Sequence, residues 1–512
     1  MATPDSEIEL KLSFPPAVLR RLGAHRLVKG GARPVTRKLH TIYYDTPSLD
    51  LWRRGVALRV RRAGRRWVQT VKGGGSVRGG LHQRTEIESE IAGPQPDLAR
   101  VREGDLAGVF ASPQVRGQLQ PVFITDFSRS SRTLDLGGET TVEASIDSGG
   151  IRSGGRVEAV NELELELKSG EASRLYDLAL GLLKDVPLAI ENRSKAERGF
   201  ALARGESLAP VKARPPTLAT DMTVDEAFTA VIWTSLAHLQ ANERGMLAGA
   251  DPEYLHQMRV ALRRLRSAFS VFAPLLPAQT IGPISAELKW LGGLLGPARD
   301  WDVFVTETLP PVHAEFGEHA ALAAFNAQCA ALRRAAARRA RRTVASQRYQ
   351  RLVLTLAGRL TAGQWSAELD EAGRGRLAAP VVQFAGTVLE RRYDRVRKRG
   401  RKLASLSPAE LHRLRIAIKK FRYATDFFAG LYEGKRAQET LKRLARLQDI
   451  LGAINDAATV GNLVGEVLSG STGRQAAEAR GILLGWSRGR AATLRRELNT
   501  AWKSFRAAEK FW

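Results

Sequence analysis

Cysteine is almost absent from this chain of 512 residues, with Cys329 as its single example. One thiol excludes internal disulfide bonds and any metal centre built from several thiolates. A bound metal would therefore be held by carboxylates or histidines, and carboxylate oxygens favour hard ions such as Mg²⁺ or Mn²⁺.

The sequence also lacks any apolar run as long as a membrane-spanning helix. The charged segment EIELK begins at Glu7, which leaves too little room for a secretory signal before it. We therefore expect a cytoplasmic protein. Its length is too great for one hydrophobic core and suits two or three domains.

Acidic residues are the minority among the charged side chains. The chain has 79 Lys and Arg against 53 Asp and Glu, a net charge of +26. Such an excess usually indicates a polyanionic partner, whether nucleic acid, an anionic membrane surface or a phosphate polymer. The alternative is a proteome that uses arginine simply for solubility.

The two halves of the chain have different periodicities. Up to about residue 205, apolar and polar residues alternate with the period of two that is typical of strands. The stretch LAPVKARPPTLATD then indicates a linker at 206–220, and residues 221–512 have helical periodicity.

The second half contains an internal repeat. The segment HQMRVALRRLRSAFSVF begins at His256, and HRLRIAIKKFRYATDFF begins at His412, 156 residues later. The match continues in register as far as Asp300 and Asp456, which predicts a duplicated helical domain with a symmetric interface between its copies.

Several predicted strands carry charge on one face only. In NELELELKSG the acids share one face and the leucines share the other, and EIELK, LRVR and RTEIES alternate in the same way. Wetted faces of an open sheet would explain any one strand. A barrel with amphipathic helices outside and charges inside explains all of them. Because a dry interior of mixed charge would be costly, we expect a watery bore that holds an anion and its cations.

The order of these motifs resembles the CYTH family of triphosphate tunnel metalloenzymes over residues 5–203. The segments that carry the resemblance are EIELK, YYDTP, LRVR, TVKGGG, GGLHQRTE, TDFSR, ELELELKSG and ENRSKAERGF. The resemblance implies an α+β chain whose first domain, at 1–205, is an eight-stranded antiparallel β-barrel with outer helices. An all-α, duplicated helical bundle would follow it.

The resemblance also implies roles for individual residues. The divalent metal, Mg²⁺ or Mn²⁺, would bind to the acids Glu7, Glu9, Glu162, Glu164 and Glu166. Phosphate oxygens would be held by Lys11, Arg59, Arg61, Lys72, Arg84, Arg129 and Lys195. Glu86 would serve a second metal and the nucleophilic water, completing a catalytic set with Glu7, Glu9 and Lys11. Asp147 precedes a Ser-Gly pair, so it is either a tunnel acid or the cap of a turn.

The helical half carries a basic stripe in each copy of its repeat. Helical spacing places one stripe on His256, Arg259, Arg263 and Arg266, and the other on His412, Arg415, Lys419 and Arg422. The histidines lack partners at ligand spacing, so a zinc site is not expected. The repeated motif, with LGPARDWDV and LQDILGAIND, resembles the CHAD family, which implies a helical domain that binds inorganic polyphosphate. About +18 of the net charge lies after residue 220, in agreement with this expectation.

The fusion of the two resemblances favours metal-dependent hydrolysis of inorganic triphosphate, with polyphosphate bound by the helical half. Three alternatives stay open at this point. The chain is a non-catalytic polyphosphate-binding or granule-associated protein, a nucleotide or thiamine triphosphatase, or a class IV adenylate cyclase. Binding of nucleic acid is not expected, because the basic stripes carry no interleaved aromatic residues for stacking.

Overall fold

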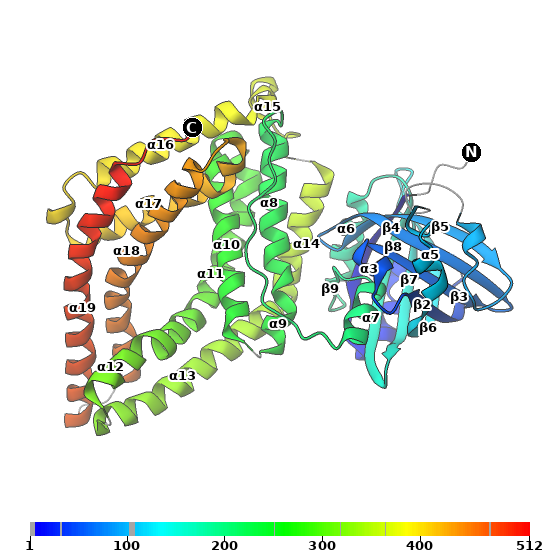
Figure 1. The fold of residues 1–512 in the computed structure, drawn as a ribbon, viewed down its shortest axis with the longest axis horizontal. Coiled ribbons are helices and arrows are strands. Elements are labelled where there is room, and N and C mark those ends of the chain that lie inside the picture. The colour runs from blue at the N-terminus through cyan, green and yellow to red at the C-terminus, as the bar shows by residue number, and fades with distance from the viewer. Residues whose placement is uncertain are drawn as a thin grey trace. The chain divides into compact units, whose positions relative to one another are not determined.

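The computed structural model describes residues 6–30, 33–101, 108–249, 251–317, 319–363, 365–469 and 473–512. The chain forms two compact units (Figure 1). The first runs to Leu208 and also includes Gln347–Gly363, and the second consists of Ala209–Ser346 and the chain from Gln364 onward. Within the described residues, no helix has the length and apolarity needed to cross a membrane.

The first unit is built on one closed antiparallel sheet. Strands follow one another in the order β5-β4-β3-β2-β6-β7-β8-β1, and pairing of β5 with β1 closes the ring. The short strand β9 pairs with Leu12 and Ser13 at the end of β1, beyond the β1 residues that pair with β5. The predicted eight-stranded antiparallel barrel is therefore confirmed. The strands are β1 (Ser6–Ser13), β2 (Val35–Asp45), β3 (Val56–Ala63), β4 (Arg66–Arg78), β5 (Leu81–Ile91), β6 (Gln120–Asp135), β7 (Thr141–Ser153), β8 (Arg156–Ser169) and β9 (Ala189–Ile190).

Short helices surround this barrel. They are α1 (Leu19–Gly23), α2 (Arg26–Lys29), α3 (Asp50–Arg53), α5 (Pro113–Gln118), α6 (Ser173–Leu182) and α7 (Lys195–Arg204). The outer face of the barrel is apolar, as alternation requires: Leu10, Leu12 and Leu163 are completely buried. Helix α6 buries Leu175 and Tyr176 as part of the same layer, so its amphipathic sequence covers the sheet from outside.

One further helix of the first unit comes from far along the sequence. Helix α14 (Gln347–Ala362) packs on α6 and on β9, where Gln350 Oε1 accepts a hydrogen bond from the Ile190 N–H. Gly358 allows the close approach, because a Cβ there would lie 2.9 Å from the Cβ of Tyr176. The sequence-based division at 206–220 did not assign this helix to the barrel.

Helix α7 closes one end of the barrel interior. Its Phe200 is fully buried against Phe123 and Tyr43, which lie side by side on the inward faces of β6 and β2. Gly199 is required there, because a Cβ would lie 2.1 Å from the ring of Phe123. The interior therefore has an aromatic end and a charged remainder.

The second unit is helical throughout, as predicted. Its helices are α8 (Val224–Ala241), α9 (Glu243–Ala248), α10 (Pro252–Phe272), α11 (Ala278–Val303), α12 (Leu309–Phe316), α13 (Ala320–Val344), α15 (Glu371–Ala378), α16 (Val381–Arg399), α17 (Pro408–Phe428), α18 (Arg436–Val467) and α19 (Arg474–Arg506). Helices α10 and α17 have identical bounds when shifted by 156 residues, and each begins with proline after a side-chain cap, Asp251 or Ser407.

The two copies of the repeat meet through α10 and α17. Within the first copy, α10 packs on α8 and α11. Within the second copy, α17 packs in the same way on α16 and α18. A further core joins the end of α18 and the start of α19 to α12 and α13, around Phe304, Phe325 and Leu483 (Figure 1). The buried sulfur of Cys329 lies in this core, where it is an apolar packing group.

Candidate functional site

Strand register brings the charged residues of the barrel into one lining. On β1, Lys11 lies opposite Glu164 of β8, and Glu9 lies opposite Glu166. On the neighbouring strands, Lys72 lies opposite Glu86, and Arg129 lies opposite Asp147. Because residues at opposed register positions share a face of the sheet, these side chains all project to the inner side of the barrel.

A first ion-pair network centres on Glu164. Lys11 Nζ lies 2.6 Å from Glu164 Oε1 and 2.7 Å from Glu9 Oε1. Lys195, the first residue of α7, places its Nζ 2.6 Å from Glu164, 2.7 Å from Glu162 and 2.8 Å from Asp147. Burial alone would raise the pKa of Glu164. Its cationic neighbours Lys11, Lys195 and Arg129 outweigh burial and hold the pKa well below its usual value, so this carboxylate is ionised.

Arg129 completes this network from β6. Its Nε and Nη2 bind the two oxygens of Asp147 at 2.7 and 2.6 Å, a bidentate pair, and Nη2 also contacts Glu164. Asp147 is completely buried in the middle of β7. The structure thus places Asp147 among the tunnel charges, and it does not cap a turn.

A second network lies on the side of β3, β4 and β5. Lys72 Nζ contacts Glu7 and lies 2.7 Å from Glu86, and Arg59 Nη2 lies 3.0 Å from the other oxygen of Glu86. The contact between Lys72 and Glu7 joins strands that are not neighbours, so it runs across the interior. Arg84 does not join this network. It lies 3.3 Å from Glu197, a residue of the capping box that begins α7.

Arg61 differs from the other predicted phosphate ligands. Among the described residues it has no carboxylate within ion-pair distance, and its Nε donates to Thr41 Oγ1 at 3.3 Å. Burial, followed by repulsion from Arg59 and Arg129, lowers the pKa of Arg61 to about 10. A partly buried guanidinium without a counter-ion is costly, and it marks a position where an anion would be stabilised.

The acids of β1, β7 and β8 have the chemistry of a hard-cation site. The pKa of Glu166 is raised by burial and by the negative charge of Glu7 and Glu143, in spite of Lys168 beside it. Mutually repelling carboxylates of this kind are relieved by a divalent cation. Within the described part of the chain, however, no three His, Cys, Asp or Glu side chains are arranged to hold a metal ion together. The donor atoms fit such an ion, but Glu162 and Glu164 are now engaged by lysine and arginine.

Sequence reasoning missed three residues of this lining. Glu143 follows the same alternation as Asp147, in TVEASID, and that spacing would have identified it. Arg198 of α7 contacts Glu162 and lies 3.0 Å from Glu158, which fixes the closing helix on the barrel. His82 faces Glu9 in the register. Burial and the nearby charge of Lys11 lower its pKa to about 3, so its imidazole is neutral at pH 7.

The helical unit brings its two basic stripes together. Burial lowers the pKa of Lys419 to about 8, assisted by the positive charges of Arg415, Arg263, Arg266 and Lys420, which come from both α17 and α10. The basic residues of the two copies are thus close enough to repel one another. We call Arg259, Arg263 and Arg266 with Arg415 and Lys419 the basic groove.

Acidic and polar groups at the ends of the basic groove differ between the copies. Arg259 Nη2 lies 3.8 Å from Asp300, whose pKa is raised by burial. The side chain of the equivalent Asp456 lies outside the described residues. His256 is half-buried, with its pKa lowered by burial and then by Arg299, whereas His412 is exposed and its Nδ1 is 2.8 Å from Asn455 Oδ1. No contact that joins Arg422 to the groove is found among the described residues.

Two arginines of the basic groove carry unsatisfied donors. The buried Nε atoms of Arg263 and Arg415 have no hydrogen-bond acceptor within the described protein. Buried donors without acceptors are unfavourable.

Comparison with known proteins agrees with this division of the chain. Residues 5–200 match the family model of the CYTH domain, and residues 230–464 match that of the CHAD domain. The CHAD domain of the plant Ricinus communis is similar in structure to this chain, with a TM-score of 0.52 and 33% sequence identity. The match covers 59% of this chain and 98% of that domain.

Two curated relatives match different lengths of the chain. Inorganic triphosphatase of Haemophilus influenzae is 30% identical over 204 residues, which are 40% of this chain and 56% of that protein. An uncharacterized protein of Mycobacterium tuberculosis is 26% identical over 285 residues, 52% of each chain. The chain thus spans about half the length of the curated relatives that it matches.

Proposed function

Because this chain joins an N-terminal CYTH domain to a CHAD domain, we propose that its barrel hydrolyses inorganic triphosphate and that its helical unit binds inorganic polyphosphate. The observation that carries the proposal is the lining of the barrel, where cations from the four strands β1, β3, β4 and β6 and from α7 converge on one interior. The identity to a protein named inorganic triphosphatase supports the choice of substrate.

The cations of the lining would bind the phosphate oxygens. These are Lys11, Arg59, Arg61, Lys72, Arg129 and Lys195, with Arg84 near α7. Phosphoryl transfer depends mainly on positioning and on neutralising the non-bridging oxygens, and these side chains supply both. Arg61, which has no carboxylate partner among the residues that the structure describes, would be the first to gain from the arriving anion.

The acids would hold Mg²⁺ or Mn²⁺. Glu7, Glu9 and Glu166 are the best placed, because each is paired with a single lysine. Glu162 and Glu164 are each paired with two or three cations. When bound, such a metal supplies charge neutralisation and lowers the pKa of a coordinated water. Glu86 faces the same interior through Lys72 and Arg59, where it would orient the attacking water.

Binding would proceed as an exchange of ion pairs. Without ligands, the lysines and arginines neutralise the carboxylates, which keeps the mixed charge of the interior tolerable. Triphosphate would take the cations, and the carboxylates released in this way would take the metal. Each ligand should therefore strengthen the binding of the other.

The helical unit would hold polyphosphate along the basic groove. The unsatisfied donors of Arg263 and Arg415, and the depressed pKa of Lys419, all favour an incoming polyanion. We infer no catalytic role for this unit.

Phosphate release from tripolyphosphate, ATP and thiamine triphosphate, each with Mg²⁺ and with Mn²⁺, tests the proposal. Tripolyphosphate should be hydrolysed with the highest kcat/KM. A clear preference for ATP or thiamine triphosphate would reassign the substrate. Tight binding without turnover of any of the three would leave a polyphosphate-binding protein in place of an enzyme.

A further inference from the structure

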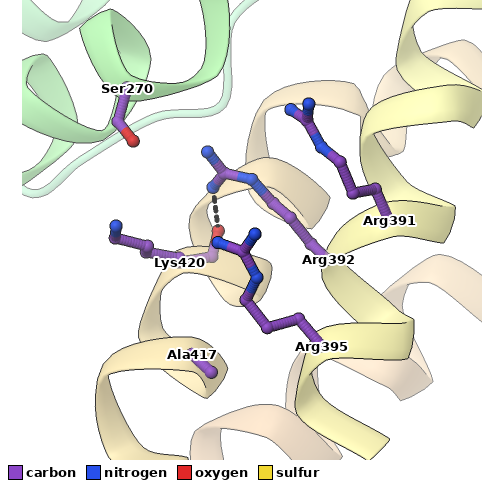
Figure 2. Close-up of a pocket in the computed structure, with 6 residues that line it drawn as sticks. All are labelled: Ser270, Arg391, Arg392, Arg395, Ala417 and Lys420. Atoms are coloured by element: carbon purple, nitrogen blue, oxygen red, sulfur yellow. Dashed lines mark hydrogen bonds between the residues drawn. The ribbon is translucent and has the colours of Figure 1, made fainter. Parts of the chain in front are cut away.

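The helical unit contains a pocket of about 190 Å³ beside α16, and none of the groove residues lines it. Its lining consists of Ser270 from α10, Arg391, Arg392 and Arg395 from α16, and Ala417 and Lys420 from α17. Figure 2 shows Arg392 and Lys420 extending from their helices toward the side where Ser270 lies. Four of the six lining residues are cationic and none is acidic.

In the part of the chain that the structure describes, no carboxylate forms an ion pair with any of these four cations. Arg392 is only 8% exposed and donates from Nη1 to the backbone oxygen of Lys420 (Figure 2). Burial, then repulsion from Arg391 and Arg395, lowers the pKa of Arg392 to about 10. Glu390 of the same helix is occupied elsewhere: its carboxylate accepts from Lys510 at 2.6 Å and from Trp512 at 2.9 Å.

The internal repeat explains where this pocket comes from. With the shift of 156 residues, Lys420 is equivalent to Arg264 and Ser270 is equivalent to Asp426. Arg264 is buried and forms an ion pair with Asp426 across the contact between α10 and α17. Its counterpart in the second copy is the pair of Lys420 and Ser270, in which a hydroxyl stands in place of the carboxylate.

Helix α16 is likewise more positively charged than α8, its equivalent in the first copy. The equivalents of Arg391, Arg392 and Arg395 are Ser235, Leu236 and Leu239, which are almost completely buried in α8. The first copy therefore packs this position with small or apolar side chains and one ion pair. In the second copy, arginines replace the two leucines and the serine, and Ser270 replaces the acid Asp426. Because the first copy packs the same position without these arginines, packing alone does not explain the four cations of the second copy.

We propose that this pocket binds a compact inorganic phosphate anion, orthophosphate or pyrophosphate, at the place where the first copy holds the carboxylate of Asp426. Arginine forks and a lysine are the side chains suited to phosphate oxygens. The volume is below the roughly 300 Å³ at which pockets for drug-sized ligands begin, which favours a small anion. The proposal does not rest on the triphosphatase activity of the barrel.

Substitutions at Ser270 test the pocket with a matched pair. Ser270→Asp supplies the missing carboxylate beside Lys420, whereas Ser270→Asn adds the same bulk without charge. The test is calorimetric titration of the full chain with pyrophosphate. In Ser270→Asp the affinity of the pocket should fall at least tenfold, so that the titration shows one binding site fewer than in the wild type. In Ser270→Asn the number of binding sites should equal that of the wild type. Equal binding by both variants would overturn the proposal.

Arg392→Leu provides an independent test, because it restores the residue of the first copy. It should lose the same site as Ser270→Asp. Gln328→Glu, an exposed change of equal charge on α13, should keep it. Thermal unfolding of each variant confirms that the fold is retained, and Ser270→Asp should unfold no earlier than wild type, since it recreates the Arg264–Asp426 pair.

Long-chain polyphosphate distinguishes a separate anion site from an extension of the basic groove. Ser270→Asp should bind the polymer within about twofold of wild type. A loss as large as that caused by Lys419→Gln would show that the pocket is part of the polymer path, and the proposal of a compact-anion site would then be wrong. Tungstate, a tetrahedral dianion visible by anomalous scattering, should occupy the pocket in crystals of the wild type and not in those of Ser270→Asp.

Discussion

Lys11 Nζ lies 2.6 Å from Glu164 Oε1, although 153 residues separate the two in the sequence. Their pairing follows from the register of β1 on β8, which sets them opposite one another. The same lysine also contacts Glu9, the third residue of EIELK. The alternating charges of that first strand thus point at partners across the barrel interior, and they are not the wetted edge of a sheet.

Removal of a carboxylate that we propose as a metal ligand should abolish turnover without unfolding the barrel. We expect Glu7→Gln and Glu9→Gln to reduce kcat with tripolyphosphate by at least about a hundredfold, since even supporting groups of metal sites contribute up to that amount. Glu90→Gln is the control, because Glu90 is exposed on β5 of the same sheet. Near-normal rates in both tunnel variants at saturating Mg²⁺ or Mn²⁺ would exclude these ligands.

Arg61→Gln should separate binding from stability. A charge-assisted hydrogen bond contributes ~1.5–3 kcal/mol, so the variant should raise the KM for tripolyphosphate about tenfold or more. The melting temperature should not fall, because Arg61 has no ion pair to lose among the described residues. Arg62→Gln, an exposed neighbour on the other face of β3, should change neither quantity. A lower melting temperature with unchanged KM would instead make Arg61 a structural residue.

Helix α14 should stabilise the barrel through its contact with α6. Gly358→Ala would place a Cβ 2.9 Å from the Cβ of Tyr176, so overpacking should cost about 1–3 kcal/mol. Gly375→Ala in α15 meets no atom within 4 Å and should stabilise its helix by ~0.5–1 kcal/mol. Denaturant unfolding of the full chain measures both. If the two variants are equally stable, the packing of α14 on α6 contributes little.

A chain ending near residue 205 keeps every proposed catalytic group but lacks α14. We expect it to hydrolyse tripolyphosphate with a kcat near that of the full chain and to unfold at a lower temperature, because the buried face of α6 becomes exposed. Steady-state kinetics well below the melting temperature measure the first expectation. Complete loss of activity in a folded truncated chain would show that the helical part supplies a catalytic group.

The basic groove should bind long-chain polyphosphate with strong dependence on salt. Arg263 and Lys419 occupy equivalent positions in the two copies. Arg263→Gln and Lys419→Gln should each weaken polyphosphate binding, and the double variant should bind more weakly than either single variant. Each neutralised contact should reduce the slope of log affinity against log salt by about 0.7–0.9, if the value for nucleic acids applies. Arg334→Gln with Arg338→Gln, both exposed on α13, is the charge-matched control. An equal effect in this control would indicate diffuse attraction in place of a groove.

Lys419 should make polyphosphate binding dependent on pH. Its pKa in the free protein is about 8, and the polyanion stabilises the protonated form, so the pKa rises on binding. Below pH 8 the lysine is protonated in both states and affinity is flat. Above pH 8 binding takes up a proton, and affinity should fall by up to about tenfold per pH unit. Calorimetry at pH 9 in buffers of different ionisation enthalpy measures the uptake, which Lys419→Arg should remove.

Local alternation and repetition are legible in the sequence because each is a short-range pattern. Period two in NELELELKSG and EIELK fixes which side chains share a face of a strand, and the charge on those faces indicates an occupied interior. The shift of 156 residues predicts the duplicated helices, and α10 and α17 have the matching bounds. Sequence reasoning can predict these features because the side-chain period of a strand or a helix is fixed by backbone geometry, which is the same in every protein.

Only the tertiary structure decided which charges meet. Arg129 is paired with Asp147 and Glu164, while Arg61 on the same lining is paired with no acid in the described part of the chain. Both outcomes depend on barrel closure and register. The association of α14 with α6 depends likewise on how helix surfaces pack. So does the pocket that Lys420 and Ser270 line together. In both cases the segments in contact are more than 100 residues apart in the chain. Such pairings are set by the way in which remote segments pack in three dimensions. A local sequence pattern does not specify the distance in space between two such segments, so it cannot predict which of their side chains meet.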